Sequence, residues 1–487
     1  MKARDTLRRW LFLLQGTGLP LRETGLPLAA TGMETADTIC AISTPPGEGG
    51  IGIIRISGPI AHKVLEKIFQ PSRKKETFLP RTLYLGNIIN IGSREIIDEV
   101  FAVFLKSPRT YTREDMAEIY SHGGFATLQG ILSQIIQQGA RLAGPGEFTK
   151  RAYLNGRIDL LQAESVLDII QSETDEELRS AVEHLEGKLS RKINKIKNNV
   201  REVLVETEAL IDFPEEEIDV DQEQCIAILH SVRKGIEKLI SSYYEGMAIR
   251  HGLEALIIGR TNVGKSSLLN ALLLKEKAIV TPLPGTTRDL IEDTIHIKGI
   301  KVKIIDTAGL RAPKDVVEQE GIDRVRHRIP GADLIIWVLD GSEPYTSEDE
   351  DIYKTITGAN RVIALNKVDI PQKLDRAKLE SRELEWMEIS ALKDTGLEEL
   401  KDAIYKKLMG KRGKQAGLLI TNVRQKESLQ KAHGAIARAI SCHLQEEPME
   451  FMAFELREAL FHLGEITGET CPEEILHDIF SRFCIGK

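Results

Sequence analysis

Residues 254–273 have the sequence EALIIGRTNVGKSSLLNALL, which predicts a strand, a tight turn and a helix in succession. The apolar run 256–258 is typical of a buried strand, and GRTNVGKS (259–266) matches the P-loop motif. In such a loop the backbone N–H groups and the helix N-terminus surround a phosphate group. We therefore expect Lys265 to bridge the β- and γ-phosphates of a nucleotide and Ser266 to ligate Mg²⁺.

Three later motifs follow in the order expected for a guanine-nucleotide site. IIDTAG ends a predicted strand, so Asp306 can hold Mg²⁺ through water and Gly309 can donate its N–H to the γ-phosphate. In ALNKVD, the Asp369 carboxylate can accept both donors of the guanine N1/N2 edge, which adenine does not offer. ISAL supplies Ser390 and Ala391, whose backbone can contact the guanine O6. Together these motifs predict a GTPase.

Leu310 follows the DTAG motif, at a place where many GTPases carry a glutamine that orients the attacking water. A leucine side chain cannot hydrogen-bond to water. The catalytic group must therefore come from elsewhere, and spacing alone assigns no arginine finger. Leu392, where lysine is commoner, matters less because the backbone contacts the base.

Composition limits the classes of protein to which this chain can belong. The 487 residues are 42% hydrophobic and 28% charged, which predicts about three domains with real cores. The net charge of -8 gives no indication of nucleic-acid binding, so any RNA contact needs a local basic patch. No apolar run approaches membrane-spanning length, so we expect no membrane partner. Five widely spaced cysteines argue against zinc and disulfides and favour the cytoplasm: Cys40, Cys225, Cys442, Cys471 and Cys484.

The hydrophobic pattern predicts a multidomain α/β protein. Residues 33–151 mix β-rich runs with a helical stretch, which indicates an α+β domain. Residues 152–251 and 411–487 carry long helical patterns, and 252–410 alternates strands and helices. An α/β unit flanked by helices suggests a G domain inserted into one helical domain. We expect residues 1–32 to precede the real start at Met33 and to have no folded role; a transit peptide is the alternative.

Several stretches together resemble one family. They are DTICAISTPPGEGGIGIIRISG, GPGEFTKRAYLNGRIDLLQAE, ALIDFPEEEID, the G motifs with TPLPGTTRD, and FCIGK. With them the chain resembles the MnmE (TrmE) family of tRNA-modification GTPases from about Thr38 onward. The resemblance implies an N-terminal folate-binding and dimerising domain, a helical domain and an inserted Ras-like P-loop G domain.

The resemblance also implies a reaction and partners. The family forms a homodimer and acts with the FAD protein MnmG (GidA) in a heterotetramer or larger complex. Together they add an aminomethyl or carboxymethylaminomethyl group at C5 of the wobble uridine of certain tRNAs. The one-carbon unit comes from 5,10-methylene- or 5-formyl-tetrahydrofolate, with FAD and NADH on the partner.

In the family a potassium ion supplies the charge of an arginine finger when two G domains associate. The matching potassium ligands here are Asn262, Thr281, Leu283 and Thr286. Thr287 matches the switch threonine on Mg²⁺, and Glu318 matches an acidic residue that orients water, although by itself it resembles a solvated helix charge. The implied nucleotide-binding residues are Asn262, Val263, Gly264, Lys265, Ser266, Ser267, Thr281, Pro282, Leu283, Pro284, Gly285, Thr286, Thr287, Asp306, Thr307, Ala308, Gly309, Asn366, Lys367, Val368, Asp369, Ser390, Ala391 and Leu392.

For folate, the resemblance implies Arg55, Glu118 and Arg157, with Lys487 reaching in from the C-terminus. It also implies that Cys484 is needed for tRNA modification but not for GTP hydrolysis. A prenylation box at Cys484 is disfavoured because glycine and lysine occupy its last two positions. A cysteine packed under the last helix remains the alternative.

Other interpretations fit the sequence less well. An assembly GTPase that binds ribosomal RNA shares the P-loop and Leu310, but predicts a C-terminal RNA-binding domain where this chain has helices and FCIGK. The glycines of 47–52 precede a strand, not the helix of a dinucleotide fold. The acidic run 212–224 lacks the EF-hand pattern, and His122 is best explained as a hydrogen-bonded loop histidine.

Overall fold

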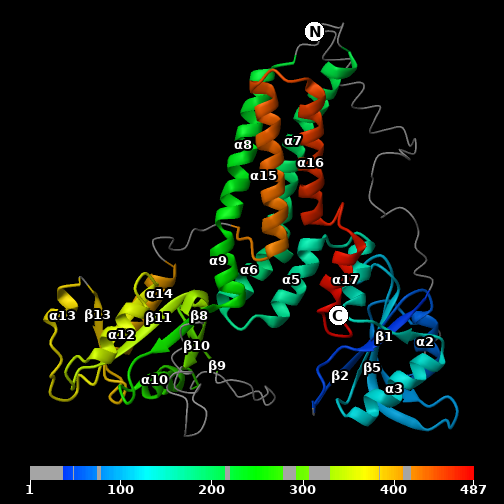
Figure 1. The fold of residues 1–487 in the computed structure, drawn as a ribbon. Helices are drawn as coiled ribbons and strands as arrows, with labels where there is room; N and C mark the ends of the chain where they lie inside the picture. Colours follow the sequence, from blue (N-terminus) through cyan, green and yellow to red (C-terminus); the bar gives the residue numbers. More distant parts are fainter. Residues whose placement is uncertain are drawn as a thin grey trace. The chain divides into compact units, whose positions relative to one another are not determined.

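The computed structural model describes residues 37–47, 49–73, 78–213, 220–277, 292–306, 329–382, 384–409 and 418–487. Its contacts divide the chain into two compact units, which we describe separately (Figure 1). The first unit comprises residues up to 170, 181–238 and 424–487, and the second comprises 171–180 and 239–423. The domain boundaries expected from the sequence stay predictions.

A seven-stranded sheet forms the N-terminal part of the first unit, with the strand order β3-β4-β5-β6-β2-β1-β7. Helices α2 (Ala61–Ile68) and α3 (Phe125–Gln137) pack their apolar side chains on one face of it. The strands are β1 (Ile39–Ile42), β2 (Gly52–Ser57), β3 (Phe69–Pro71), β4 (Leu83–Ile89), β5 (Ile96–Leu105), β6 (Met116–Ser121) and β7 (Arg141–Leu142).

Alternation along the strands separates the two faces of this sheet. In β2, Ile54 and Ile56 are fully buried under the helices, whereas Arg55 between them points to the opposite face. The antiparallel pairing of β2 with β6 sets Arg55 directly across from Glu118. Leu85 and Phe101 are paired on the same face and remain exposed. One face is therefore the core, and the other combines charged and apolar side chains.

The rest of the first unit is helical. Helix α7 (Lys188–Asp212) buries residues at spacings of three and four, which is the pattern expected of a bundle helix. It packs against α16 (Met449–Thr467) in a bundle that Figure 1 shows with α8 (Gln222–Ser241) and α15 (Val423–Leu444). The remaining helices are α4 (Glu147–Leu154), α5 (Leu160–Gln171), α6 (Asp175–Leu185), α9 (Tyr243–His251) and α17 (Glu473–Ser481); the contact division cuts α6 and α8 and assigns α9 to the second unit.

The second unit contains a six-stranded sheet with the strand order β13-β12-β11-β8-β10-β9. All neighbouring pairs are parallel except β9 with β10, so several carboxyl ends meet at one edge. Apolar clusters fill both faces of the sheet, as parallel strands require. The elements are β8 (Leu253–Ile258), α10 (Lys265–Lys277), β9 (Glu292–Ile297), β10 (Ile300–Asp306), η3 (Ile329–Gly331), β11 (Leu334–Asp340), α12 (Ser347–Thr355), β12 (Arg361–Asn366), α13 (Ala377–Glu380), β13 (Trp386–Glu388) and α14 (Leu397–Met409).

Candidate functional site

The phosphate loop joins the end of β8 to the start of α10, as the sequence predicts. A Cβ atom on Gly264 would lie 2.3 Å from Asn366 Nδ2, and its φ is +97°, so only glycine fits this turn. The Lys265 ammonium donates hydrogen bonds to the carbonyls of Gly259 (2.9 Å) and Arg260 (2.6 Å). These bonds hold the charge of Lys265 over the loop that is expected to surround the phosphates.

Asn366 connects the phosphate loop to the predicted base-recognition loops. Its Nδ2 donates to the Val263 carbonyl at 2.9 Å, and its Oδ1 accepts from the Ala391 N–H at 3.0 Å. Ser390 Oγ donates to Asp369 Oδ1 at 2.6 Å. A carboxylate has about four acceptor positions, so Asp369 keeps acceptor capacity for the two donors of guanine. Because the Ala391 N–H already donates to Asn366, its contact with O6 requires that this bond be shared.

Asp340 is a member of this site that the motifs do not reveal. It ends the buried strand β11 and accepts a hydrogen bond from Lys367 Nζ at 2.5 Å. Burial raises the pKa of Asp340, but the hydrogen bonds from Lys367 and Ser342 outweigh it and hold the pKa below its ordinary value. The available signal was an aspartate at the carboxyl end of an apolar strand, LIIWVLD.

Much of the predicted metal chemistry lies outside the described residues, namely Thr281–Thr287, Thr307–Gly309, Leu310 and Glu318. The backbone of Asp306 ends β10 and pairs with Ile257 of β8, which places it at the same sheet edge as the phosphate loop. Within the described ranges, no group of three or more His, Cys, Asp or Glu side chains is placed to hold a metal ion. The Mg²⁺ and K⁺ ligands stay predictions.

A second cluster lies on the open face of the seven-stranded sheet. Arg55 Nε donates to Glu118 Oε1 at 2.8 Å, and the Tyr120 hydroxyl donates to Glu118 Oε2 at 2.6 Å. Burial and this hydrogen bond to Glu118 raise the pKa of Tyr120 to about 12, so its hydroxyl stays a donor. Both oxygens of Glu118 are therefore oriented by neighbours within the chain.

Tyr111 joins the two predicted arginines of this cluster. The guanidinium carbon of Arg157 lies 4.6 Å from the centroid of the Tyr111 ring, and that of Arg55 lies 5.9 Å from it. Arg157 Nη1 also donates to the Tyr111 carbonyl at 3.2 Å. Such cation–π contacts fix the planes of the guanidinium groups. Neither Tyr111 nor Tyr120 was identified from the sequence, although both stand within TYTREDMAEIYS beside Glu118.

The segment 484–487 docks onto the same part of the sheet. Ile485 forms an isolated bridge with Pro145, and Ser43 Oγ donates to the Gly486 carbonyl at 3.2 Å. This docking brings the Lys487 ammonium within range of electrostatic interaction with Arg55 and Glu118. Burial and the positive charge of Arg55 lower the pKa of Lys487, although Cys484 and Glu118 oppose them. Cys484 itself is exposed. The structure thus brings together Arg55, Glu118, Arg157, Cys484 and Lys487, which are distant in sequence.

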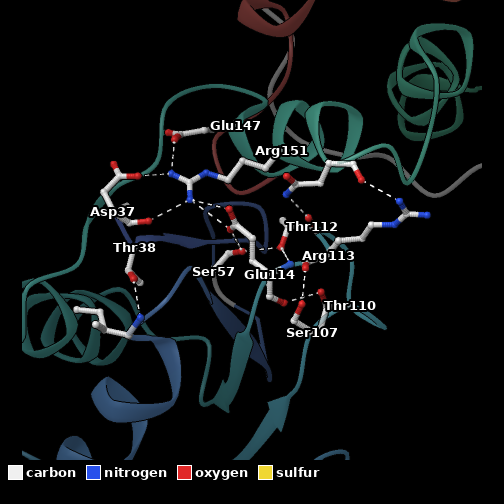
Figure 2. A network of polar contacts seen from close by, with 12 residues as sticks. Asp37, Thr38, Ser57, Ser107, Thr110, Thr112, Arg113, Glu114, Glu147 and Arg151 are labelled. Atoms are coloured by element: carbon white, nitrogen blue, oxygen red, sulfur yellow. Dashed lines mark hydrogen bonds and ion pairs between the residues drawn. The ribbon is translucent and has the colours of Figure 1, made fainter. Parts of the chain in front are cut away.

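Figure 2 shows a buried ionic network that supports this cluster from helix α4. The Arg151 side chain is only 3% exposed and pairs with Asp37 (2.8 Å), Glu147 (3.0 Å) and Glu114 (3.2 Å). Ser57 of β2 also donates to Glu114, at 2.7 Å. The network fixes α4 against the sheet just before the chain reaches Arg157. Only the spacing of Glu147 and Arg151, four residues apart on one helix, could have indicated it.

Three remaining sequence features can be located. His122 hydrogen-bonds through Nδ1 to Asp98 at 2.7 Å, as expected of a loop histidine. Gly52 begins the strand β2, so the glycines of 47–52 do not open a helix. All five cysteines are free thiols. Among the described helices, none is long and apolar enough to cross a membrane.

A P-loop at the sheet edge, joined by Asn366 to an aspartate-bearing base loop, defines a GTP-binding protein. Two family models match the chain: the TrmE N-terminus of a GTP-binding protein over residues 38–157 and the MnmE helical domain over residues 160–484. The tRNA modification GTPase MnmE of Thermoanaerobacter pseudethanolicus is 44% identical over 457 residues, covering 93% of this chain and 99% of that protein. The chain belongs to the MnmE (TrmE) family of tRNA modification GTPases.

Other similar proteins include the tRNA modification GTPase MnmE of Natranaerobius thermophilus, which is 44% identical over 457 residues and is covered along 100% of its length. This alignment covers 93% of the present chain. Among solved structures, the FeoB G domain of Methanococcus jannaschii is 26% identical, with a TM-score of 0.25, covering 32% of this chain and 97% of that one.

Proposed function

We propose that this GTPase is stimulated by potassium and, together with the FAD protein MnmG, modifies C5 of the wobble uridine of certain tRNAs in the cytoplasm. The product is an aminomethyl- or carboxymethylaminomethyl-uridine, and a tetrahydrofolate supplies the one-carbon unit. The observation that carries this proposal is a cluster of four side chains. Arg55 and Arg157 contact the Tyr111 ring, Glu118 pairs with Arg55, and the charge of Arg55 acts on Lys487.

The chemistry of the cluster fits a reduced folate. Its pteridine ring presents neighbouring N–H donors, and Glu118 has acceptor positions beyond those used by Arg55 and Tyr120. The folate tail ends in carboxylates, which Arg157 and Lys487 can pair with. Arg157 is exposed and already oriented by the Tyr111 ring, so little side-chain entropy is lost when it binds.

On the nucleotide side, we assign Lys265 to the β- and γ-phosphates and Asp369 to the guanine base. Asn262, proposed as a potassium ligand, is exposed at the loop with a φ of +62°. A cation fixed beside the phosphates supplies the positive charge that an arginine finger provides in other GTPases. Ser266 and Thr287 complete the proposed Mg²⁺ site, with Asp306 acting through water.

We also assign the open face of the sheet to the homodimer. Leu83, Leu85 and Phe101 are exposed there on β4 and β5. Phe101 lies opposite Tyr120 on β6, so the apolar patch adjoins the proposed folate cluster. A second copy that covers this patch removes apolar surface from water and encloses the cluster.

The test is complementation of a strain that lacks this gene, with wobble-uridine modification measured in its tRNA. Cys484→Ser is compared with Cys471→Ser, a matched change of a partly buried thiol, and GTP turnover is measured on the purified proteins. We expect Cys484→Ser alone to lose modification while GTP turnover persists. The structure has Cys484 exposed, so it is not packed under the last helix, and normal modification by Cys484→Ser would leave this thiol without a role in the reaction. Failure of the wild-type gene would refute the proposed wobble-uridine reaction.

A further inference from the structure

One helix of the bundle carries an unbroken run of positive charge. Residues 188–201 read KLSRKINKIKNNVR, with six lysines and arginines and no acidic residue, in a chain whose net charge is -8. This run forms the first half of α7. Helix surfaces that are merely solvated usually mix charges of both signs, so a single-sign stretch needs another explanation.

The charges of α7 are directed to solvent. Its core stripe includes Leu189, Ile193, Ile196 and Val200. A displacement of two residues along a helix is a rotation of about 200°, so the face opposite this stripe bears residues 191, 195 and 198. Arg191, Lys192, Lys195 and Arg201 are all exposed, and so are Asn194 and Asn198. Amide side chains and cations therefore alternate along the outer face.

Not all the cations of this run are available. Lys197 is buried and pairs with Glu469 at 2.5 Å, and Lys188 pairs with Glu183 at 3.1 Å. These two lysines form ion pairs within the helical bundle. For Lys192 and Lys195, in contrast, no acidic residue stands within the run to neutralise them. The outer cations are thus separated from those that stabilise the bundle.

Helix α8 extends the same surface. The two helices approach each other at two places. Cys225 Sγ of α8 donates to Glu206 Oε2 of α7 at 2.8 Å. A Cβ atom on Gly235 of α8 would lie 3.9 Å from Ile196 of α7. Lys234 lies opposite the buried stripe of α8, which includes Leu229, Val232 and Ile236, and is exposed. Because both stripes face one core, the outer faces of α7 and α8 adjoin. We call these exposed basic and amide residues of α7 and α8 the basic face.

Helix α16, which packs on the other side of α7, has the opposite character. Its sequence MEFMAFELREALFHLGEIT contains four glutamates and one arginine, and that arginine, Arg457, pairs with Glu208. A polyanion is therefore attracted to the first half of α7 and repelled by α16.

We propose that the basic face of α7 and α8 binds the phosphate backbone of the tRNA substrate. This inference rests on the proposed function, because the family's tRNA chemistry identifies the polyanion. Lysine and arginine neutralise phosphates, and asparagine amides donate to phosphate and to the ribose 2′-hydroxyl. Contacts of this kind position the RNA without reading its sequence.

The test measures binding of the full-length protein to a transcript of a tRNA with uridine at the wobble position, over a series of KCl concentrations. Lys192→Glu/Lys195→Glu is compared with Lys63→Glu/Lys67→Glu on α2, where both lysines are also exposed and the change of net charge is identical. A milder Lys192→Gln/Lys195→Gln variant avoids introducing negative charge. GTP turnover confirms that each variant folds.

We expect the α7 double reversal to weaken binding about tenfold or more and to reduce the salt slope by about 1 to 2, since each lost phosphate contact removes roughly 0.7 to 0.9 from the slope. The glutamine variant should show a smaller loss, and the α2 variant should bind nearly as the wild type does. An equal loss in both reversals, or no loss at α7, would overturn the proposal. Normal RNA binding with lost modification would assign the basic face to a protein partner.

Complementation separates this inference from the proposed function. If the wild-type protein restores modification and the α7 variant binds tRNA normally, only the proposal that the basic face binds tRNA is refuted. A wild-type protein that does not restore modification refutes the proposed function as well. A wild-type protein that restores modification but does not bind the transcript also overturns the assignment of this face.

Discussion

The nucleotide site and the proposed folate cluster are built in different ways. Around the phosphate loop, most contacts use backbone atoms and glycines, and the loop residues are neighbours in sequence. Around Glu118, the contacts use charged and aromatic side chains from distant parts of the chain. A backbone site is fixed by local conformation, whereas a side-chain site depends on the fold that holds its members together.

Because of this difference, we expect different substitutions to inactivate the two sites. The nucleotide site should fail mainly through residues that touch the nucleotide. The proposed folate cluster should also fail through residues outside the cluster, because α4 and the docked segment 484–487 must hold their places. Five measurements test whether the two sites differ in this way.

The largest effect is expected for Arg151→Ala. It leaves Glu114 partly buried without its cation, and loss of one partner from a buried pair costs about 3–5 kcal/mol. Glu147 keeps its ion pair with Arg141. Native-state hydrogen exchange of β1 and β2 amides measures the free energy of their opening. Lys150→Ala, on the same helix, is the control and should change it by less than about 1 kcal/mol. Equal effects would show that the network adds little to the sheet.

Acid should weaken the same network. The pKa of Glu147 is about 2 rather than 4.5, because hydrogen bonds from Arg141 and the Gly144 N–H outweigh the effect of burial, which raises it. A lowered folded-state pKa gives stability that is complete above pH 4.5 and is lost as the pH falls toward 2, on the order of 3 kcal/mol. Urea unfolding should show about 2 kcal/mol of this loss between pH 5 and pH 3, and Glu147→Gln should show less of it. The same pH dependence in the wild type and in Glu147→Gln would show that Glu147 is not the group responsible for the loss of stability in acid.

On the nucleotide side, Lys265→Ala should weaken GTP binding about 100-fold or more. A charged hydrogen-bonding group that is removed from a phosphate contact costs about 3 kcal/mol. Titration of a fluorescent GTP analogue measures the change. Lys298→Ala, which removes an exposed ion pair with Asp402, serves as the control. Retained affinity in Lys265→Ala would refute the phosphate-site assignment.

Glu118→Gln should weaken binding of 5-formyl-tetrahydrofolate about tenfold, since an amide has one acceptor oxygen and no charge, whereas a carboxylate has two acceptor oxygens and a negative charge. Equilibrium dialysis measures the affinity. Glu99→Gln is the matched control, because Glu99 is exposed on β5 of the same sheet. Unchanged affinity in Glu118→Gln would count against the folate site, whereas a loss in both variants would indicate a general effect of charge.

The smallest effect is expected from the cation. GTP turnover should be several-fold faster in KCl than in NaCl at equal ionic strength, because K⁺ replaces the missing catalytic charge. Asn262→Ala should abolish this difference. Equal rates of the wild-type protein in the two salts would remove the potassium mechanism and leave hydrolysis to the protein's own groups.

The fold was predictable where its signals are local. Patterns at 51–57 and 99–105 predicted strands that the structure has as Gly52–Ser57 and Ile96–Leu105. The helix expected near 124–138 is Phe125–Gln137. The strand order was not predictable, because β1 pairs with β2 and also with β7, about one hundred residues later. Pairing between distant strands depends on packing that periodicity does not encode.

The site residues that form a contiguous motif were predictable from the sequence, whereas those that depend on distant partners were not. Lys265, Asn366 and Asp369 follow from motifs, because a contiguous loop carries its own signature. Asp340 and Tyr111 were missed, since each acts through a partner that only the fold brings near. Arg55 and Glu118 came from family resemblance; the β2–β6 register supplies the physical reason for their pairing.

The docking of 484–487 on β1 has a consequence for synthesis. Ser43 and Gly486 are 443 residues apart, so the ribosome makes this edge of the sheet long before the segment that covers it. Domains generally fold as they emerge, N-terminal parts first. The G domain is therefore complete while the cluster around Glu118 still lacks Cys484 and Lys487. A chain interrupted late in translation would contain the nucleotide site without the complete proposed folate cluster.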